Sequence, residues 1–302
     1  MANRPNLFLV GAMKSGTTAL HELLAVHPQV SMSEPKEPCR FVPSEILRND
    51  WPEMWRMAFW RDEAAYLRLF RDKPLARYFG ESSTDYSKLP RIPGVPQAIR
   101  GYAPDARIIY IMRDPVERTI SHYWHMVEHR AETRPLLRAI QEEPHYREVS
   151  YYALQLAPYL QSFGETRVYT LTSEELRRDP VEAVQALYRW LGISADFVPG
   201  GVGEKHNATS ARVAQKRAGR LWLDRLRHSA FWGRAGPLLP PRLRRLGRTL
   251  VEKQVTPKET DAREALQFLR PLQRKQTEDL ARLLGRNFSE WTTLYGGDGN
   301  PE

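Results

Sequence analysis

The sequence of 302 residues has a single cysteine, Cys39, and no long run of apolar residues. One thiol cannot form a disulfide within the chain, so covalent cross-links have no part in the expected fold. A membrane-spanning helix requires about 20 consecutive apolar residues, and no segment approaches that length. A secretory signal peptide is also lacking, because the short apolar run at residues 7–10 leads directly into a glycine. We therefore expect a protein of a reducing compartment, the cytoplasm.

Acidic residues are almost absent from residues 205–251. This segment holds twelve Lys or Arg residues and one acid, Asp224, so its net charge is +11 against +9 for the whole chain. A positive charge of this size favours an anionic partner such as a nucleotide, a nucleic acid or a membrane surface. No nucleic-acid recognition motif accompanies the charge, and we expect no nucleic-acid partner.

Apolar and aromatic residues are mixed with arginines over residues 217–251 of this basic segment. A basic amphipathic stretch with tryptophan is able to lie at a membrane surface. It is equally suited to form a lid over an anionic or lipid-linked acceptor, or a helical layer that packs on the core and leaves its arginines in water. The sequence leaves these three interpretations open.

Short apolar segments alternate with amphipathic ones along much of the chain. The pattern predicts strands at residues 7–10, 29–33, 76–79, 107–112 and 167–171. It predicts helices at residues 17–26, 95–102, 114–128, 150–163, 181–191 and 261–284, with one or two more within 51–70. Such alternation indicates a parallel sheet covered by helices on both faces. We expect one α/β domain over residues 1–295, with residues 205–251 as a basic helical elaboration and residues 296–302 as a disordered tail.

The residues from Gly11 to Thr18 (GAMKSGTT) join the first predicted strand to the first predicted helix. A glycine-containing loop at this point presents backbone N–H groups and a helix N-terminus to an anion. The spacing fits G-x-x-x-x-G-x-T, the pattern of a P-loop, except that the lysine is Lys14 and the residue after the second glycine is Thr17. We therefore expect a P-loop-type sheet; the alternative is an ordinary turn between a strand and a helix.

The position of the lysine bears on the ligand. A lysine directly after the second glycine reaches the β and γ phosphates of a nucleoside triphosphate. Lys14, inside the loop, is placed over a shorter chain, that is, one phosphate and the group attached to it. The sequence presents no obvious second set of Mg²⁺ ligands, so we expect no metal. A nucleotide-dependent kinase is the alternative enzyme, and it would need a lysine at position 17.

A second candidate anion site follows the predicted strand at residues 107–112. The segment RDPVERTISHY begins at Arg113, which lies at a strand's carboxyl end and hence on the same sheet edge as the first loop. Arg118, Ser121 and His125 lie along one face of the helix that follows. An arginine fork and a serine hydroxyl together suit a phosphate. Taken alone, this segment would fit equally well a capped helix start with a solvated arginine.

Together, the two motifs resemble those of the PAPS-dependent sulfotransferase family. The stretches MKSGTTALHELLAVHP and SEPKEPCRF are most similar to the heparan sulfate and carbohydrate sulfotransferases and their bacterial relatives, over about the first 190 residues. The resemblance implies sulfuryl transfer from PAPS to a hydroxyl or amine by in-line displacement. The acceptor would be a carbohydrate, a glycolipid or a secondary metabolite, and the sequence does not choose among them.

The resemblance also implies roles for individual residues. The 5′-phosphosulfate would be held by Lys14, Ser15, Gly16, Thr17 and Thr18. Arg113 and Ser121 would hold the 3′-phosphate, and a basic loop within 205–217 would close over the nucleotide. Lys14 would also neutralise charge on the bridging oxygen during transfer.

Glu37 is the first candidate for the base that takes the proton of the acceptor. It matches the glutamate of the K-E-P-H-F-F element of the carbohydrate branch, although Cys39 and Arg40 here replace His and Phe. The alternative is a surface glutamate in a proline-rich turn.

Glu81 is the second catalytic candidate, expected to orient Lys14, Lys36 or the acceptor. His122 and His125 are alternative bases, and His27 is expected to be structural. The oligomeric state is left open. The remaining alternative is a basic, non-enzymatic protein that binds membrane surfaces through residues 217–251.

Overall fold

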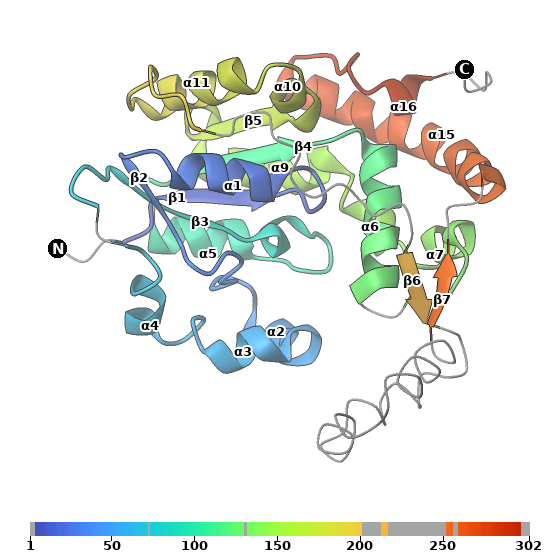
Figure 1. Cartoon of the computed structure of the whole chain (residues 1–302), viewed down its shortest axis with the longest axis horizontal. Helices are drawn as coiled ribbons and strands as arrows, with labels where there is room; N and C mark the ends of the chain where they lie inside the picture. The colour runs from blue at the N-terminus through green and yellow to red at the C-terminus, as the bar shows by residue number, and fades with distance from the viewer. Residues whose placement is uncertain are drawn as a thin grey trace.

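The computed structural model describes residues 4–71, 73–129, 132–200, 213–216, 252–255 and 259–296 (Figure 1). Its centre is a sheet of five parallel strands in the order β2-β3-β1-β4-β5. The strands are β1 (Leu7–Gly11), β2 (Val30–Met32), β3 (Tyr78–Ser82), β4 (Arg107–Met112) and β5 (Val168–Thr172). The parallel α/β sheet predicted from the alternating pattern is thus confirmed.

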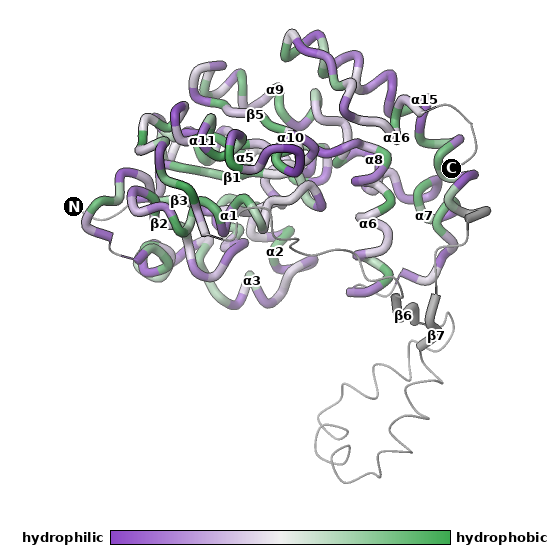
Figure 2. Tube along the Cα trace, turned by 45° about the horizontal axis from the view of Figure 1, so that its top comes forward, coloured by the Kyte–Doolittle hydropathy of each residue, from purple (hydrophilic) through white to green (hydrophobic). Residues whose placement is uncertain are grey.

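The two central strands have apolar residues on both faces, as a sheet covered on both sides requires. In β1, Leu7 and Leu9 enter one cluster of buried residues, and Phe8 and Val10 enter the other. Alternation along a strand sends successive side chains to opposite faces, so a single apolar run supplies two cores. Figure 2 shows β1 as a hydrophobic segment surrounded by helices in which hydrophobic and hydrophilic residues alternate.

One face of the sheet is covered by α1 (Thr17–Ala25), α10 (Ser173–Arg178) and α11 (Pro180–Leu191). The opposite face is covered by α5 (Val95–Tyr102) and α9 (Tyr152–Phe163), with α6 (Pro115–His129) and α15 (Glu259–Leu284) further out. Each of these helices turns its apolar residues toward the sheet. Full burial of one such side chain contributes about 1.5–3 kcal/mol to the free energy of folding.

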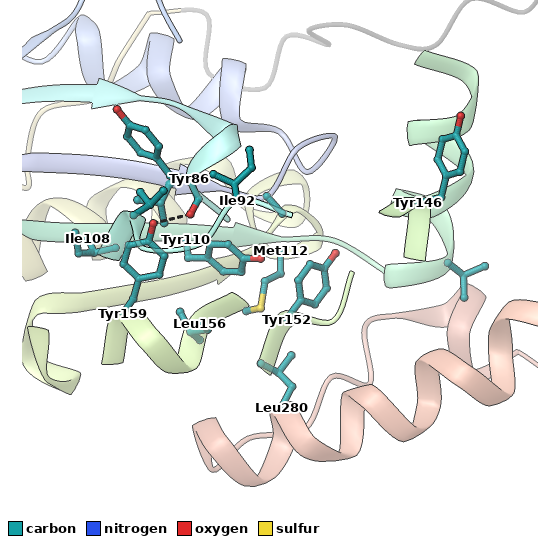
Figure 3. Packing of buried hydrophobic residues seen from close by; sticks show 14 of the residues in the cluster. Tyr86, Ile92, Ile108, Tyr110, Met112, Tyr146, Tyr152, Leu156, Tyr159 and Leu280 are labelled. Atoms are coloured by element: carbon teal, nitrogen blue, oxygen red, sulfur yellow. Dashed lines mark hydrogen bonds between the residues drawn. The ribbon is translucent and has the colours of Figure 1, made fainter. Parts of the chain in front are cut away.

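Tyrosines take part in the packing of α9 on β4 and on the turn after β3 (Figure 3). The rings of Tyr110 on β4 and Tyr152 on α9 meet edge to face, with 6.0 Å between their centroids. Tyr159 donates its phenol proton to the carbonyl of Tyr86 at 2.8 Å. These residues bury large apolar surface, and the hydroxyl of Tyr159 has a partner, as a buried phenol requires.

Several shorter elements complete the described chain. After β2 come α2 (Ser44–Asp50), α3 (Pro52–Met57) and α4 (Glu63–Leu67); the 3₁₀ turn η1 (Thr84–Ser87) follows β3. Between α6 and β5 lie α7 (Leu136–Glu142), α8 (His145–Glu148) and η2 (Glu165–Arg167). An antiparallel pair, β6 (Val213–Lys216) with β7 (Glu252–Val255), precedes α15, and α16 (Thr292–Tyr295) is last.

The predicted elements differ from the observed ones in a few places. The helical segment predicted within 51–70 is preceded by an unpredicted helix, α2, and the helices α7, α8 and α10 and the strand β7 were not predicted either. Strand β3 begins and ends later than predicted, because parallel pairing with β1 continues to Ser82 and places Glu81 inside the strand. In the basic segment, β6 is a strand where a helical elaboration was expected; the rest of 205–251 and the tail after residue 296 lie outside the described residues.

The connections leave β1 and β4 in opposite directions. After β1 the chain crosses by α1 to β2 at one edge of the sheet, whereas after β4 it crosses by α6 to α9 to β5 at the other edge. The carboxyl ends of these two neighbouring strands are therefore the point at which the connections diverge, the usual ligand site of an open α/β sheet; this place is called the β1–β4 crevice below. Among the helices in the described ranges, none is both long and apolar enough to cross a membrane.

Candidate functional site

The first loop, residues 11–18, follows β1 and ends at the N-terminus of α1. Gly16 is the N-cap residue with φ 94°, and Lys14 is also left-handed with φ 69°. None of the described side chains caps α1, so the N–H groups of its first turn face the loop. This is an arrangement that binds anions.

Glycine is required at position 11 because another segment approaches closely. A Cβ atom there would lie 2.0 Å from Oγ of Ser87 and 2.9 Å from the ring of Tyr110. The Ser87 hydroxyl donates to the carbonyl of Val10 at 2.8 Å, which fixes it in that place. The η1 turn after β3 thus packs directly on the first loop.

Polar side chains of the loop are partly withdrawn from water. Ser15 is fully buried, and its hydroxyl lies beside the phenol of Tyr152. Thr17 is also buried, whereas Thr18 and Lys14 are half-buried. Burial and the nearby charge of Arg113 lower the pKa of Lys14, while Glu128 on α6 opposes the shift. The loop therefore places hydroxyl groups and one cation in partly buried surroundings at the start of α1.

Arg113 follows β4 and reaches the first loop. Its Nη1 atom lies 3.5 Å from the carbonyl oxygen of Lys14, and its Nε and Nη2 atoms donate to Oε2 of Glu117 at 3.1 and 2.7 Å. The two motifs predicted to share a sheet edge therefore meet at the crevice between β1 and β4.

The backbone at Arg113 is held on both sides. Tyr152 donates its phenol proton to the Arg113 carbonyl at 2.7 Å. Asp114 caps α6 by accepting from the N–H groups of Val116 and Glu117 at 3.0 and 3.2 Å. These contacts fix the point at which the arginine side chain leaves the sheet edge.

The helix face predicted to carry Arg118, Ser121 and His125 serves two purposes. Arg118 is fully buried, and its guanidinium donates to the Ser150 hydroxyl and the Tyr146 carbonyl. Burial lowers the pKa of Arg118 to about 10. Arg118 thus anchors α6. Ser121, the residue of this face predicted to contact the ligand, is buried with 7% of its surface exposed.

Glu37 lies where the chain after β2 crosses the carboxyl end of β3. Its N–H donates to the carbonyl of Ser82 at 2.9 Å, and its backbone is left-handed with φ 62°. The carboxylate accepts from the N–H of Thr84 at 2.7 Å and pairs with Lys36 at 2.7 Å. The side chain keeps 27% of its surface exposed, so it is oriented without being buried.

Glu81 points to the other side of β3, away from α1. It is fully buried and accepts a hydrogen bond from Tyr66 at 2.7 Å. Burial raises the pKa of Glu81 to about 7, although hydrogen bonds from Tyr86 and Tyr66 oppose the shift. The hydrogen bonds to its carboxylate thus come from tyrosines, and Lys36 pairs with Glu37 instead.

Arg40, which replaces a phenylalanine of the K-E-P-H-F-F element, covers this tyrosine cluster. Its guanidinium lies 4.7 Å from the ring centre of Tyr66 and 5.2 Å from that of Tyr102. Cys39 is buried, and its N–H donates to the Ser83 hydroxyl at 3.1 Å. Arg40 and Cys39, which differ from the Phe and His of the K-E-P-H-F-F element, thus both have defined partners beside the tyrosine cluster.

Comparison with known proteins identifies the family. The profile of the Sulfotransferase family matches residues 5–197, which include both motifs. This chain belongs to that family. The resemblance stated from the sequence is thereby confirmed.

Individual relatives of the family are distant. The chain is 27% identical over 213 residues to the bifunctional heparan sulfate N-deacetylase/N-sulfotransferase 2 of Bos taurus, covering 63% of this chain but 22% of the relative. It is 25% identical over 201 residues to the bifunctional heparan sulfate N-deacetylase/N-sulfotransferase 1 of Caenorhabditis elegans. A sulfotransferase structure from Alicyclobacillus acidocaldarius shares 29% identity with a TM-score of 0.67, covering 95% of this chain and 98% of that one.

The histidines of this sulfotransferase-family chain differ in their surroundings. His122 is buried, and burial and Arg118 hold its pKa well below the usual range. His125 stacks on His129, with 4.4 Å between ring centroids. His27 has both ring nitrogens engaged, with the Ser194 carbonyl and the Gln29 N–H, as expected of a structural residue.

Sequence reasoning missed two features near the site. His21 on α1 makes a 2.8 Å hydrogen bond with Ser82 at the end of β3, and burial lowers its pKa to about 4. Its spacing of four residues after Thr17 was a usable signal, because such residues share a helix face. The second is α16, where Thr293 and Leu294 contact the start of α6; nothing local in the sequence indicates this contact.

In the described ranges, no group of three or more His, Cys, Asp or Glu side chains is arranged to hold a metal ion.

The raised pKa of Glu81 predicts a pH dependence of stability. The folded protein retains the proton up to pH values near 7, whereas the unfolded chain loses it near 4.5, so the free energy of unfolding falls as pH rises between these values. A shift of this size corresponds to about 3 kcal/mol. Glu81→Gln should remove this contribution, which urea unfolding of both proteins at pH 5 and pH 8 would measure. Equal pH slopes for wild type and variant would contradict the assignment.

Proposed function

We propose that this chain transfers a sulfuryl group from PAPS to a hydroxyl or amine of a carbohydrate acceptor. The observation that carries the proposal is the meeting of two anion-binding segments, at the contact between Arg113 and the Lys14 carbonyl. They follow the neighbouring strands β1 and β4 at the carboxyl edge of the sheet, where open α/β sheets bind their ligands. Membership of the Sulfotransferase family supports the same reaction class.

The first loop supplies the groups for the 5′-phosphosulfate. The N-terminus of α1, which no described side chain caps, offers N–H donors to an anion, and the hydroxyl of the buried Ser15 lies in the same loop. Gly16, Thr17 and Thr18 provide the backbone and hydroxyl donors at the helix start. The residues present therefore fit the donor.

Lys14 is placed to neutralise charge during transfer. Its pKa is lowered by burial and by Arg113, so an added anion at the crevice would stabilise its charged form. As the bond between sulfur and the bridging oxygen breaks, negative charge grows on that oxygen. A fixed ammonium group there stabilises the transition state more than the ground state.

Arg113 and Ser121 are proposed to hold the 3′-phosphate. Arg113 lies at the start of α6 and Ser121 two turns further along it. A guanidinium binds phosphate oxygens in a two-pronged fork, and a serine hydroxyl adds a third donor. With Lys14 on the 5′ side, this divides the nucleotide between the two motifs.

Glu37 is proposed as the base that takes the acceptor's proton. Its side chain keeps 27% of its surface exposed, and its carboxylate is oriented by Lys36 and by the N–H of Thr84. Thr84 belongs to η1, the turn that packs on the first loop. Glu81 is buried beneath this site and acts through its neighbours, as a positioning residue. A base with access to solvent and a fixed orientation is what proton transfer from an incoming acceptor requires.

The acceptor class rests on the names of the relatives. The matched relatives are heparan sulfate N-deacetylase/N-sulfotransferases, and the chain spans 22% of the length of the one from Bos taurus. We therefore propose a carbohydrate acceptor and leave open whether an amine or a hydroxyl receives the group. The kinase alternative is not favoured, since Thr17 stands where a P-loop kinase has its lysine.

Nucleotide binding tests the donor. Calorimetric titration without metal should show binding of adenosine 3′,5′-bisphosphate and much weaker binding of ATP with Mg²⁺. Lys14→Ala and Arg113→Ala should each weaken the bisphosphate about tenfold or more, because each removes a charge-assisted contact. Binding of ATP with Mg²⁺ in preference to the bisphosphate would overturn the proposal in favour of a kinase.

Transfer of radiolabelled sulfate from PAPS tests the base. The acceptor probe is a heparan-type polysaccharide with free glucosamine amines, compared with the same polysaccharide after N-acetylation. Glu37→Gln should lower kcat by about 10²–10⁴-fold, as expected for loss of a general base, with little change in the KM for PAPS. An unchanged kcat in Glu37→Gln would exclude this role, and a loss in Glu81→Gln alone would reassign it.

A further inference from the structure

The last described helix, α16, is fastened to the start of α6. The N–H of Leu294 donates to Oδ2 of Asp114 at 2.8 Å, and the hydroxyl of Thr293 donates to Oε1 of Glu117 at 2.8 Å. Residues at the C-terminal end of the described chain thus contact the RDP motif directly, across more than 170 positions of sequence.

The same two residues are held from the opposite side by α15. Arg270 donates to the carbonyl of Thr293 at 2.9 Å, and Arg274 donates to the carbonyl of Leu294 at 3.1 Å. The backbone of α16 is therefore fixed between two helices, and the Thr293 hydroxyl is presented to Glu117 at a defined position.

Glu117 divides its two oxygens between different partners. Oε1 accepts from Thr293, and Oε2 accepts from Nε and Nη2 of Arg113 at 3.1 and 2.7 Å. Although burial opposes the shift, the hydrogen bonds from Arg113 and Thr293 lower the pKa of Glu117. The carboxylate stays ionised and cannot rotate without losing one of its partners.

This contact determines which edge of the Arg113 guanidinium is used. Glu117 takes the edge formed by Nε and Nη2, so the outer edge, Nη1 with Nη2, is turned to the crevice, where Nη1 lies 3.5 Å from the Lys14 carbonyl. A guanidinium binds phosphate in a fork through two nitrogens of one edge. The arginine is thus oriented before a ligand arrives, which lowers the entropy lost on binding.

We propose that Glu117 and Thr293 are positioning residues that make the site select nucleotides with a 3′-phosphate. They act through Arg113: Thr293 holds Glu117, and Glu117 holds the guanidinium. The inference rests on the proposed function, in that Arg113 is taken to bind the 3′-phosphate, and it adds a contribution from the C-terminal helix to that site.

A comparable ion pair elsewhere in the chain provides the contrast. Arg138 and Glu142 are also four residues apart on a helix, but their side chains are 68% and 43% exposed, against 26% and 33% for Arg113 and Glu117. An exposed pair of this kind contributes little to stability or to orientation. Glu142→Gln is therefore a matched control for Glu117→Gln.

The experiment compares two nucleotides that differ by the group in question. Dissociation constants for adenosine 3′,5′-bisphosphate and adenosine 5′-monophosphate are measured by calorimetry on the full chain, and their ratio reports recognition of the 3′-phosphate alone. The variants are Glu117→Gln, Thr293→Val, Thr293→Ser and Glu142→Gln. Thermal unfolding is followed in parallel, so that loss of structure is detected separately.

The relay of contacts from Thr293 through Glu117 to Arg113 predicts a graded loss of the preference for the bisphosphate over the monophosphate. Glu117→Gln should reduce the ratio about tenfold and Thr293→Val about threefold, with the affinity for the monophosphate nearly unchanged. Thr293→Ser keeps the hydroxyl and should retain the preference, as should Glu142→Gln.

Three results would overturn the inference, and the third also affects the proposed function. If wild type prefers the bisphosphate but Glu117→Gln weakens both nucleotides equally, or Thr293→Val leaves the ratio unchanged, the relay is wrong and the proposed donor stands. If wild type itself does not distinguish the two nucleotides, Arg113 does not read a 3′-phosphate, and the proposed function fails together with the relay.

Discussion

Two cationic side chains, Lys14 and Arg113, are held close together at one crevice of the sheet, and the rest of the site depends on this. Burial, and then the charge of Arg113, lower the pKa of Lys14. Like charges brought together in a partly buried place favour an anion between them. Glu117 and Glu128 compensate part of the charge, and a ligand with two anionic groups would compensate the rest.

The fold provides this arrangement through parallel pairing. β1 and β4 are neighbours, so the loops that follow them lie side by side, while their connections leave to opposite sides. Several buried contacts then fix the second loop: Tyr152 holds the Arg113 carbonyl, and Arg118 ties α6 to Ser150. Breaking a buried contact of this type leaves an unsatisfied group, so the position of Arg113 is strongly determined.

Local patterns in the sequence were sufficient to predict the five-stranded sheet and to place the two candidate anion-binding segments on one edge of it. Strand β4 and helix α5 were predicted with their observed ends, because their periodicity and flanking residues are unambiguous. Glu81 illustrates the limit: its place in β3, and hence its burial below Tyr66, follows from pairing with β1, which the sequence does not display. The contact of Thr293 with Glu117 could not be predicted either, since it joins segments far apart in the chain.

The central claim is that one nucleotide with two phosphate groups bridges the first loop and Arg113. The most direct test is a crystal structure of the protein with adenosine 3′,5′-bisphosphate. The account predicts the 5′-phosphate at the N-terminus of α1 beside Lys14, and the 3′-phosphate on the outer edge of Arg113 beside Ser121, with Glu117 still on the inner edge. A nucleotide bound away from the β1–β4 crevice, or an Arg113 side chain in contact with neither phosphate, would contradict it.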